Sequence, residues 1–241
     1  MLSIMKVSQV TESFNLDNVV PFFQPIMDLT TNQVWRYECL ARLITLGEHP
    51  FIPTEFLYLV DRQESRSQLT ETIFNRSAQY FRERDIPWNI NISLADMQDE
   101  GIHRFLSTQA QSYPNPQRVA LEVTAQNVLA DTYTFETFSL LCKKLGLSLF
   151  VDNLEPDVEQ VEHLLELPIS AVKVSGPVLA DLAKNEKAQS IIKTLCEQGR
   201  HKNIDLVAQH LESEEQLNLL KHLNVRYAQG FYFSQPKAQA H

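Results

Sequence analysis

Short apolar runs alternate along the chain with longer stretches of helical periodicity. The apolar runs are rich in Val, Ile, Leu and Phe and predict strands at residues 20–26, 34–40, 86–92, 119–123, 147–151, 171–174, 204–208 and 226–233. The periodic stretches predict helices at residues 53–79, 132–145, 158–165, 178–196 and 213–223. This alternation is typical of strand and helix units around a largely parallel sheet.

The first two predicted strands are joined by a connection that is too short for a helix. Residues 28–33 separate them and include Asn32, which favours a tight hairpin and an antiparallel pair. The whole pattern predicts an α/β fold, a TIM-like (β/α)8 barrel with one antiparallel strand. The alternative is an open doubly wound sheet, but no glycine-rich turn follows a strand, and the chain has only six glycines.

The composition is that of an ordinary globular chain, with 44% hydrophobic and 21% charged residues. A length of 241 residues suits one α/β barrel, so we expect a single domain over residues 1–241. No apolar run could span a membrane, and residues 1–11 lack the layout of a signal peptide, which predicts a cytoplasmic protein with no membrane association. The cysteines Cys39, Cys142 and Cys196 are odd in number and widely spaced, so we expect buried free thiols.

The formal net charge of the chain is −9, which argues against binding of nucleic acid through a basic surface. An anionic ligand would then have to be held by local cations or by a metal ion. The seven histidines show no metal-ligand spacing, so surface or capping roles are the expectation for them.

Polar side chains stand at or near the ends of seven predicted strands. Because the strands of a barrel deliver their carboxyl ends to one rim, these groups should share a cavity there. Three are carboxylates, and with an amide oxygen they form a set of hard ligands that suits Mg²⁺, Mn²⁺ or Ca²⁺ rather than zinc. The alternative is that Glu122 and Asp152 are capping or surface groups that fall near strand ends by accident. The seven residues are Glu38, Asn91, Glu122, Asp152, Lys173, Gln209 and Gln229.

The same residues lie in an ordered series of motifs between residues 22 and 236. In order and approximate spacing, the series resembles the EAL domain family, the cyclic di-GMP phosphodiesterases. It opens with Phe23-Gln24-Pro25-Ile26 and Glu38-Cys39-Leu40-Ala41-Arg42, where the family has (Y/F)QPI and EALLR. It continues with Asn89-Ile90-Asn91-Ile92-Ser93, Leu121-Glu122-Val123-Thr124, Val151-Asp152, Val172-Lys173 and residues 228–236.

The resemblance implies a TIM-like barrel that binds extended cyclic di-GMP across its strand ends. It implies that Glu38 and Lys173 take part in catalysis, with Lys173 beside the attacked phosphate or its water. It also implies Mg²⁺ or Mn²⁺ as the cofactor, with Ca²⁺ as an inhibitor. The implied metal ligands are Glu38, Asn91, Glu122 and Asp152, and the implied nucleotide-binding residues are Gln24, Leu40, Arg42 and Gln229.

The chain departs from the family pattern around the second metal position. Asn153 stands where the family has a second aspartate, and Gln209 stands where the family motif AEGVE has its first glutamate; this chain reads Ala208-Gln209-His210-Leu211-Glu212. The family loop FGTGYS is replaced by residues 154–159, and its tethering glutamate by Ala125. The three acids that remain suit one divalent ion better than two. We therefore expect a degenerate site that holds one ion.

Three functions are compatible with this pattern. The first is a cyclic di-GMP receptor or regulator with weak or no hydrolysis; the others are an active phosphodiesterase that gives linear pGpG and a nucleotide-independent interaction module. We favour the first, because Gln24, Arg42 and Gln229 are retained whereas Asn153 and Gln209 replace acids. As a stand-alone domain the chain would act through an unidentified regulatory protein, and a homodimer is a further option.

Overall fold

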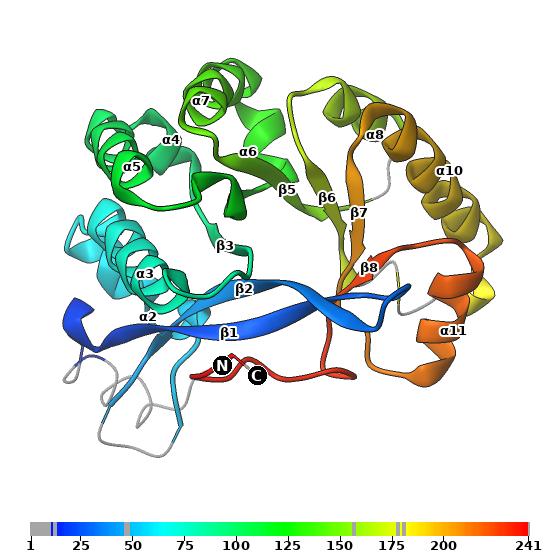
Figure 1. Ribbon diagram of the computed structural model, residues 1–241, viewed down its shortest axis with the longest axis horizontal. Coiled ribbons are helices and arrows are strands. Elements are labelled where there is room, and N and C mark those ends of the chain that lie inside the picture. The colour runs from blue at the N-terminus through cyan, green and yellow to red at the C-terminus, as the bar shows by residue number, and fades with distance from the viewer. Residues whose placement is uncertain are drawn as a thin grey trace.

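The strands close into a barrel in which neighbours follow one another in chain order, from β1 round to β8 (Figure 1). This computed structural model describes residues 11, 14–45, 49–155, 158–176, 179 and 182–240. The predicted barrel is confirmed, and each predicted strand overlaps an observed one. The strands are β1 (Val19–Asp28), β2 (Gln33–Leu43), β3 (Trp88–Asn91), β4 (Val119–Thr124), β5 (Ser148–Leu154), β6 (Ala171–Val174), β7 (Asp205–Ala208) and β8 (Tyr227–Ala228).

β1 is the antiparallel strand of the barrel, because it runs against both of its neighbours, β2 and β8. The other neighbouring strands pair in parallel. In the turn between β1 and β2, Asn32 takes a left-handed φ of 54° and Asp28 Oδ1 accepts from the backbone N–H of Thr30 at 2.8 Å. The predicted hairpin is confirmed, and its register sets Gln24 opposite Glu38.

β8 is shorter than the sequence pattern predicts. It covers only Tyr227–Ala228, whereas the apolar run extends over residues 226–233. Beyond β8 the chain turns over Leu211: a Cβ on Gly230 would lie 2.1 Å from the Leu211 carbonyl oxygen, and the Tyr232 N–H donates to that oxygen at 2.9 Å. This close approach of two backbones ends the strand, and glycine is the residue that permits it.

Helices cover the outside of the barrel, as Figure 1 shows for α3, α5, α7, α8, α10 and α11. Short 3-10 helices occur at Leu16–Asn18, Pro116–Arg118 and Leu182–Lys184. The predicted helices at residues 132–145, 158–165 and 213–223 are confirmed. The described α-helices are α2 (Pro53–Arg62), α3 (Arg66–Phe81), α4 (Leu94–Gln98), α5 (Glu100–Ser112), α6 (Ala125–Ala130), α7 (Thr132–Leu145), α8 (Val158–Glu166), α10 (Glu186–Lys202) and α11 (Glu214–His222).

Two helical predictions need correction. The single helix predicted at residues 53–79 is two helices, α2 and α3, which separate around Glu64, where φ is 50°. The helix predicted at residues 178–196 corresponds to α10, which begins only at Glu186 and runs to Lys202; residues 177, 178, 180 and 181 lie outside the described residues. No element is predicted where α4, α5 and α6 lie. α4 and α6 are too short to show a period, whereas α5, with 13 residues, is long enough and is missed.

The inside of the barrel is polar where the parallel strands end and mainly apolar where they begin. The exception at the apolar end is Arg36, which is buried with its guanidinium 4.5 Å from the centre of the Phe150 ring. Trp35 stacks on Tyr227 with ring centroids 3.9 Å apart, and this pair lies in the apolar end. Lys173 follows Ala171 by two positions on β6, so both side chains face the interior, one level apart. The apolar floor consists of Ile26, Trp35, Ala120, Phe150, Ala171, Val207 and Tyr227.

The described residues show neither a reactive thiol nor a membrane-spanning helix. Cys39, Cys142 and Cys196 are buried and free, as predicted. Burial raises the pKa of each thiol, so none of them is a ready nucleophile. No helix in this part of the chain is both long and apolar enough to cross a lipid bilayer.

Candidate functional site

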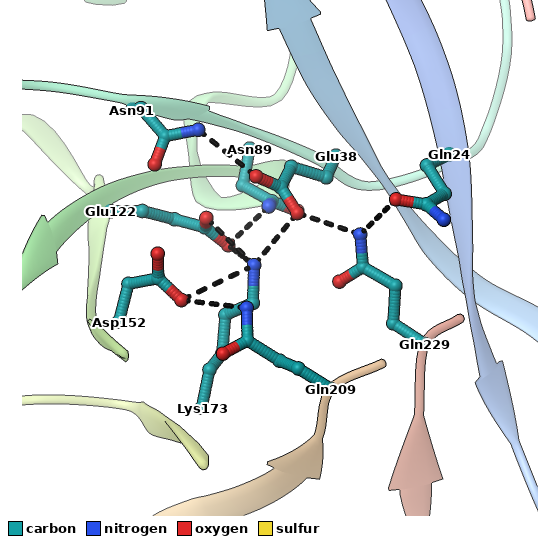
Figure 2. A network of polar contacts seen from close by, with 9 residues as sticks. All are labelled: Gln24, Glu38, Asn89, Asn91, Glu122, Asp152, Lys173, Gln209 and Gln229. Carbon is teal, nitrogen blue, oxygen red and sulfur yellow. Dashed lines mark hydrogen bonds and ion pairs between the residues drawn. The ribbon is translucent and has the colours of Figure 1, made fainter. Parts of the chain in front are cut away.

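Lys173 stands at the centre of the polar rim and is surrounded by three carboxylates (Figure 2). Its Nζ lies 2.8 Å from Glu38 Oε2, 2.8 Å from Glu122 Oε2 and 3.7 Å from Asp152 Oδ1. Lys173, Glu122 and Glu38 are only 0%, 1% and 5% exposed. Each of the four residues comes from a different strand, so barrel closure is what brings these charges together.

Amide side chains from neighbouring strands donate to the same carboxylates. Asn91 Nδ2 donates to Glu38 Oε1 at 2.9 Å, and Gln229 Nε2 donates to Glu38 Oε2 at 2.7 Å. Asn89 Nδ2 donates to Glu122 Oε1. These bonds fix the orientation of both glutamates before any ligand arrives.

Three glutamines extend the network to β1 and β7. Gln209 Nε2 donates to Asp152 Oδ1 at 2.8 Å, while its own Oε1 is buried and has no partner among the described residues. Gln229 Nε2 donates also to Gln24 Oε1 at 2.9 Å, and Gln24 Nε2 donates to the Ser234 carbonyl at 3.1 Å. The network thus crosses the rim from β5 to β1.

The charges of the cluster shift the pKa values of Glu38, Glu122 and Lys173. Burial raises the pKa of Glu38, but the charge and hydrogen bonds of Lys173 outweigh burial and lower that pKa to about 2. Burial and then the charge of Glu38 raise the pKa of Glu122 well above its ordinary value. Burial by itself would lower the pKa of Lys173, yet the charges of Glu122, Glu38 and Asp152 raise it. Lys173 is therefore a permanent counter-ion for the acids.

The strand-end residues named from the sequence meet in one place. Leu40, Arg42 and Asn153, which were also singled out in the sequence, make no hydrogen bond within this network. Leu40 lines cavities beside the network, Arg42 Nη1 donates to the Ala41 carbonyl at 2.8 Å, and Asn153 is exposed with a left-handed φ of 55°. Asn89 was not among the predicted site residues, although its position two residues before Asn91 places both on the same face of β3.

Two cavities open beside the network. One has a volume of about 280 Å³ and is lined by residues that include Leu40, Asn91 and Arg66. The other has a volume of about 210 Å³ and is lined by residues that include Gln24, Leu40 and Gln229. Leu40 therefore contributes to the walls of both cavities.

The donor chemistry of the cluster fits a divalent cation. Three carboxylates lie around the Lys173 ammonium, and the buried Arg36 is a further cation whose charge acts on Glu122. The acids still outnumber these two cations, and the unpartnered Gln209 Oε1 is a further oxygen beside Asp152. As they stand, no three acidic, histidine or cysteine side chains among the described residues converge on one metal position. The carboxylates instead surround Lys173, so an ion would have to draw them towards itself.

Glu38 and Glu122 should respond to pH in opposite directions. The lowered pKa of Glu38 means that its charge stabilises the fold above the unfolded pKa of about 4.3, and this contribution is lost as the pH falls towards about 2. The pKa of Glu122 is raised, so its ionisation costs stability as the pH rises above about 4.3.

Urea unfolding of two variants in the presence of a chelator measures these contributions. Relative to the unaltered protein, Glu38→Gln should lose stability as the pH rises from about 3 to 7, whereas Glu122→Gln should gain stability over the same range. Each variant serves as the control for the other, because both remove one buried carboxylate from the same cluster. A shared direction would contradict the opposite pKa shifts.

Comparison with known proteins identifies relatives along most of the chain. A family model described as EAL domain matches residues 7–236. The cyclic di-GMP phosphodiesterase PdeB of Shewanella oneidensis is 23% identical over 239 residues, which make up 96% of this chain and 28% of that protein. The chain spans between 28% and 38% of the length of the curated cyclic di-GMP phosphodiesterases that it matches.

Solved structures share the fold. PaMucR phosphodiesterase in complex with c-di-GMP has a TM-score of 0.85 and 20% identity, over 97% of this chain and 98% of that chain. The EAL domain of Xanthomonas citri FimX in complex with c-diGMP has a TM-score of 0.85 and 16% identity, over 98% of this chain and 96% of that chain. With the match of the family model to residues 7–236, these findings confirm the resemblance seen in the sequence: the chain belongs to the EAL domain family.

Proposed function

We propose that this protein binds cyclic di-GMP at the barrel rim and hydrolyses it slowly or not at all. The hydrogen bond from Gln209 Nε2 to Asp152 Oδ1 carries this proposal. An amide in this place donates to the aspartate, whereas a carboxylate would offer another ligand oxygen to a metal ion. Asn153, the other substituted acid, is exposed and neutral. The rim therefore keeps its binding groups and lacks two charges that a second ion needs.

The shape of the rim supports binding of an elongated ligand with two flat ends. The cavities of about 280 and 210 Å³ lie on either side of Leu40 and share it as a wall. Cyclic di-GMP has two guanine bases joined through a central phosphate ring, so one base in each cavity would place the phosphates over the polar network. The larger cavity has mainly apolar walls, as a site for a flat base requires, whereas the smaller one is lined by more polar groups that could donate to or accept from a base edge.

We assign one Mg²⁺ or Mn²⁺ to this site, with Glu38, Asn91, Glu122 and Asp152 as the residues that would hold it. When bound, the ion would offset the carboxylate charge and polarise a phosphate oxygen. Lys173 would add a fixed positive charge beneath the phosphates, because its ammonium already lies 2.8 Å from two glutamates. The residues in these proposed roles are the same ones that the sequence predicts.

Addition of Mg²⁺ or Mn²⁺ alone should raise the midpoint of thermal unfolding. An ion that binds only the folded chain stabilises it by about 2.7 kcal/mol at a concentration of 100 times its Kd. Glu38→Gln should lose most of this shift, whereas Glu100→Gln, at an exposed position on α5, should keep it. An equal shift in both variants would place the ion elsewhere.

Calorimetric titration with cyclic di-GMP tests the proposed binding site. Arg42→Ala should weaken binding by about 30-fold or more, roughly 2 kcal/mol, as expected for a charge-assisted contact that the ligand desolvates. The guanidinium would first have to leave the Ala41 carbonyl, to which it donates at 2.8 Å. Arg104→Ala on α5 is the matched control, because Arg104 is exposed and lines neither of the two cavities. Equal affinities for the two variants would remove Arg42 from the site.

The output of such a receptor would pass through another protein. The unidentified regulatory partner and the homodimer expected from the sequence both stay predictions. Light scattering with and without cyclic di-GMP would test the homodimer, which predicts a doubled mass in at least one of the two conditions.

A further inference from the structure

The backbone at His210 adopts a conformation that residues other than glycine rarely take. Its φ is 58°, in the left-handed region, directly after the network residue Gln209. Histidine tolerates this region better than most residues, but the conformation still costs free energy compared with glycine. The family motif AEGVE has glycine at this position, so this chain departs from the motif with a residue that is strained there. Such strain persists where the surroundings hold the residue in place.

Gly176, in the connection that follows β6, leaves space for the His210 ring. A Cβ on Gly176 would lie 2.5 Å from His210 Nδ1 and 2.6 Å from its Cγ, so any larger residue there would displace the ring. Gly176 follows β6, which carries Lys173. The imidazole thus has a defined place between the ends of β6 and β7.

That place is the wall of the smaller cavity. His210 lines the cavity of about 210 Å³ together with Gln24, Glu38 and Gln229. Among the residues that the structure describes, none forms a hydrogen bond with the imidazole, whereas the neighbouring amides bond to one another and to carboxylates. His210 is exposed, so its ring nitrogens face solvent and are accessible to a ligand in this cavity.

The charge of the cavity makes this donor important for an anionic ligand. Glu38 and Glu212 both line the cavity, and the protein carries a net charge of −9. Of the residues that line it, His210 is the one that can carry a positive charge. Lys173 is already held by carboxylates, and Arg42 donates to a backbone carbonyl.

We propose that His210 is a further nucleotide-binding residue, whose imidazole N–H donates to a phosphate oxygen of the ligand bound in this cavity. This inference rests on the proposed binding of cyclic di-GMP. It explains why a strained residue faces the cavity and why Gly176 leaves room for the ring. It also gives the site a donor that is independent of the cation at the carboxylates.

Two substitutions separate binding from backbone strain. His210→Gly removes the imidazole and relieves the left-handed strain, so it should raise the midpoint of thermal unfolding while it weakens binding of cyclic di-GMP at least fivefold. His210→Asn keeps a residue that tolerates the left-handed region and should weaken binding to a similar extent. The matched control is Asn224→Gly, at a φ of 60° outside the residues that line the cavity, which should leave the affinity unchanged.

Calorimetry with cyclic di-GMP and long-range ¹H–¹⁵N NMR of the histidine rings give the deciding results. We expect one imidazole signal, absent from His210→Asn, to shift when cyclic di-GMP is added. If the unaltered protein binds but His210→Gly binds equally well or better, the inference about His210 is wrong and the proposed function stands. If the unaltered protein binds no cyclic di-GMP, the proposed function itself is wrong, and this inference falls with it.

Discussion

Lys173→Met should destabilise the protein by about 3 kcal/mol or more. Removal of one partner from a buried ion cluster leaves the other charges uncompensated, and such losses amount to roughly 3 to 5 kcal/mol. Here the loss should lie in that range, because Lys173 is the counter-ion of Glu38, Glu122 and Asp152 and is itself 0% exposed. Urea unfolding at neutral pH with a chelator present measures the difference.

The control for this prediction is a lysine in an exposed ion pair. Lys202 pairs with Glu166 on the surface, where the two side chains are 33% and 75% exposed, so Lys202→Met should cost no more than about 1 kcal/mol. The deficit of Lys173→Met should also shrink as the pH falls, because protonation of Glu38 removes the charge that Lys173 balances. Equal losses in the two variants would contradict the role of Lys173 as the internal counter-ion.

Asn153→Asp combined with Gln209→Glu should raise hydrolysis of cyclic di-GMP well above that of either single variant. Asn153→Asp adds a carboxylate next to Asp152 in the sequence, and Gln209→Glu replaces the N–H donor that now bonds to Asp152 Oδ1 with a carboxylate. Groups that act as a unit are not additive, so each single variant should gain little. We expect the double variant to exceed the better single variant by at least about tenfold, or 1.4 kcal/mol in the barrier.

The measurement is release of linear pGpG in Mn²⁺ or Mg²⁺, followed by chromatography. Gln111→Glu on α5, an exposed amide changed to an acid elsewhere on the molecule, controls for added negative charge. Turnover by the unaltered protein on the order of one per second or faster would show an ordinary enzyme rate, and the reading as a receptor would then be wrong.

The sequence predicts the barrel well because each strand is a short apolar run and each connection has the right length. The hairpin can be predicted from the sequence because Asn32 tolerates the left-handed conformation of the turn that joins β1 to β2. The strand-end residues meet because parallel strands end at one rim. All three inferences depend on local pattern together with one general rule of the fold.

The parts that the sequence does not predict depend on contacts between distant segments. β8 ends early because the backbone at Gly230 packs against Leu211. The hydrogen bond from Arg42 to the Ala41 carbonyl depends on the rotamer of the arginine side chain. The sequence pattern does not indicate which rotamer is adopted. Asn89 could have been found from its alternation with Asn91 along one strand face. The enclosure of Lys173 by three acids needed coordinates, because its partners are 135, 51 and 21 positions away in the sequence.

The most direct test is a single titration followed by analysis of the nucleotide. The unaltered protein is titrated with cyclic di-GMP in a calorimeter in the presence of Mg²⁺, and the nucleotide is then recovered by denaturing the protein and separated by chromatography. We predict saturable heat with one cyclic di-GMP per chain and recovery of the nucleotide as intact cyclic di-GMP. Saturable heat with recovery of linear pGpG would contradict the claim of binding without efficient hydrolysis, and absence of heat together with intact nucleotide would contradict the claim of binding.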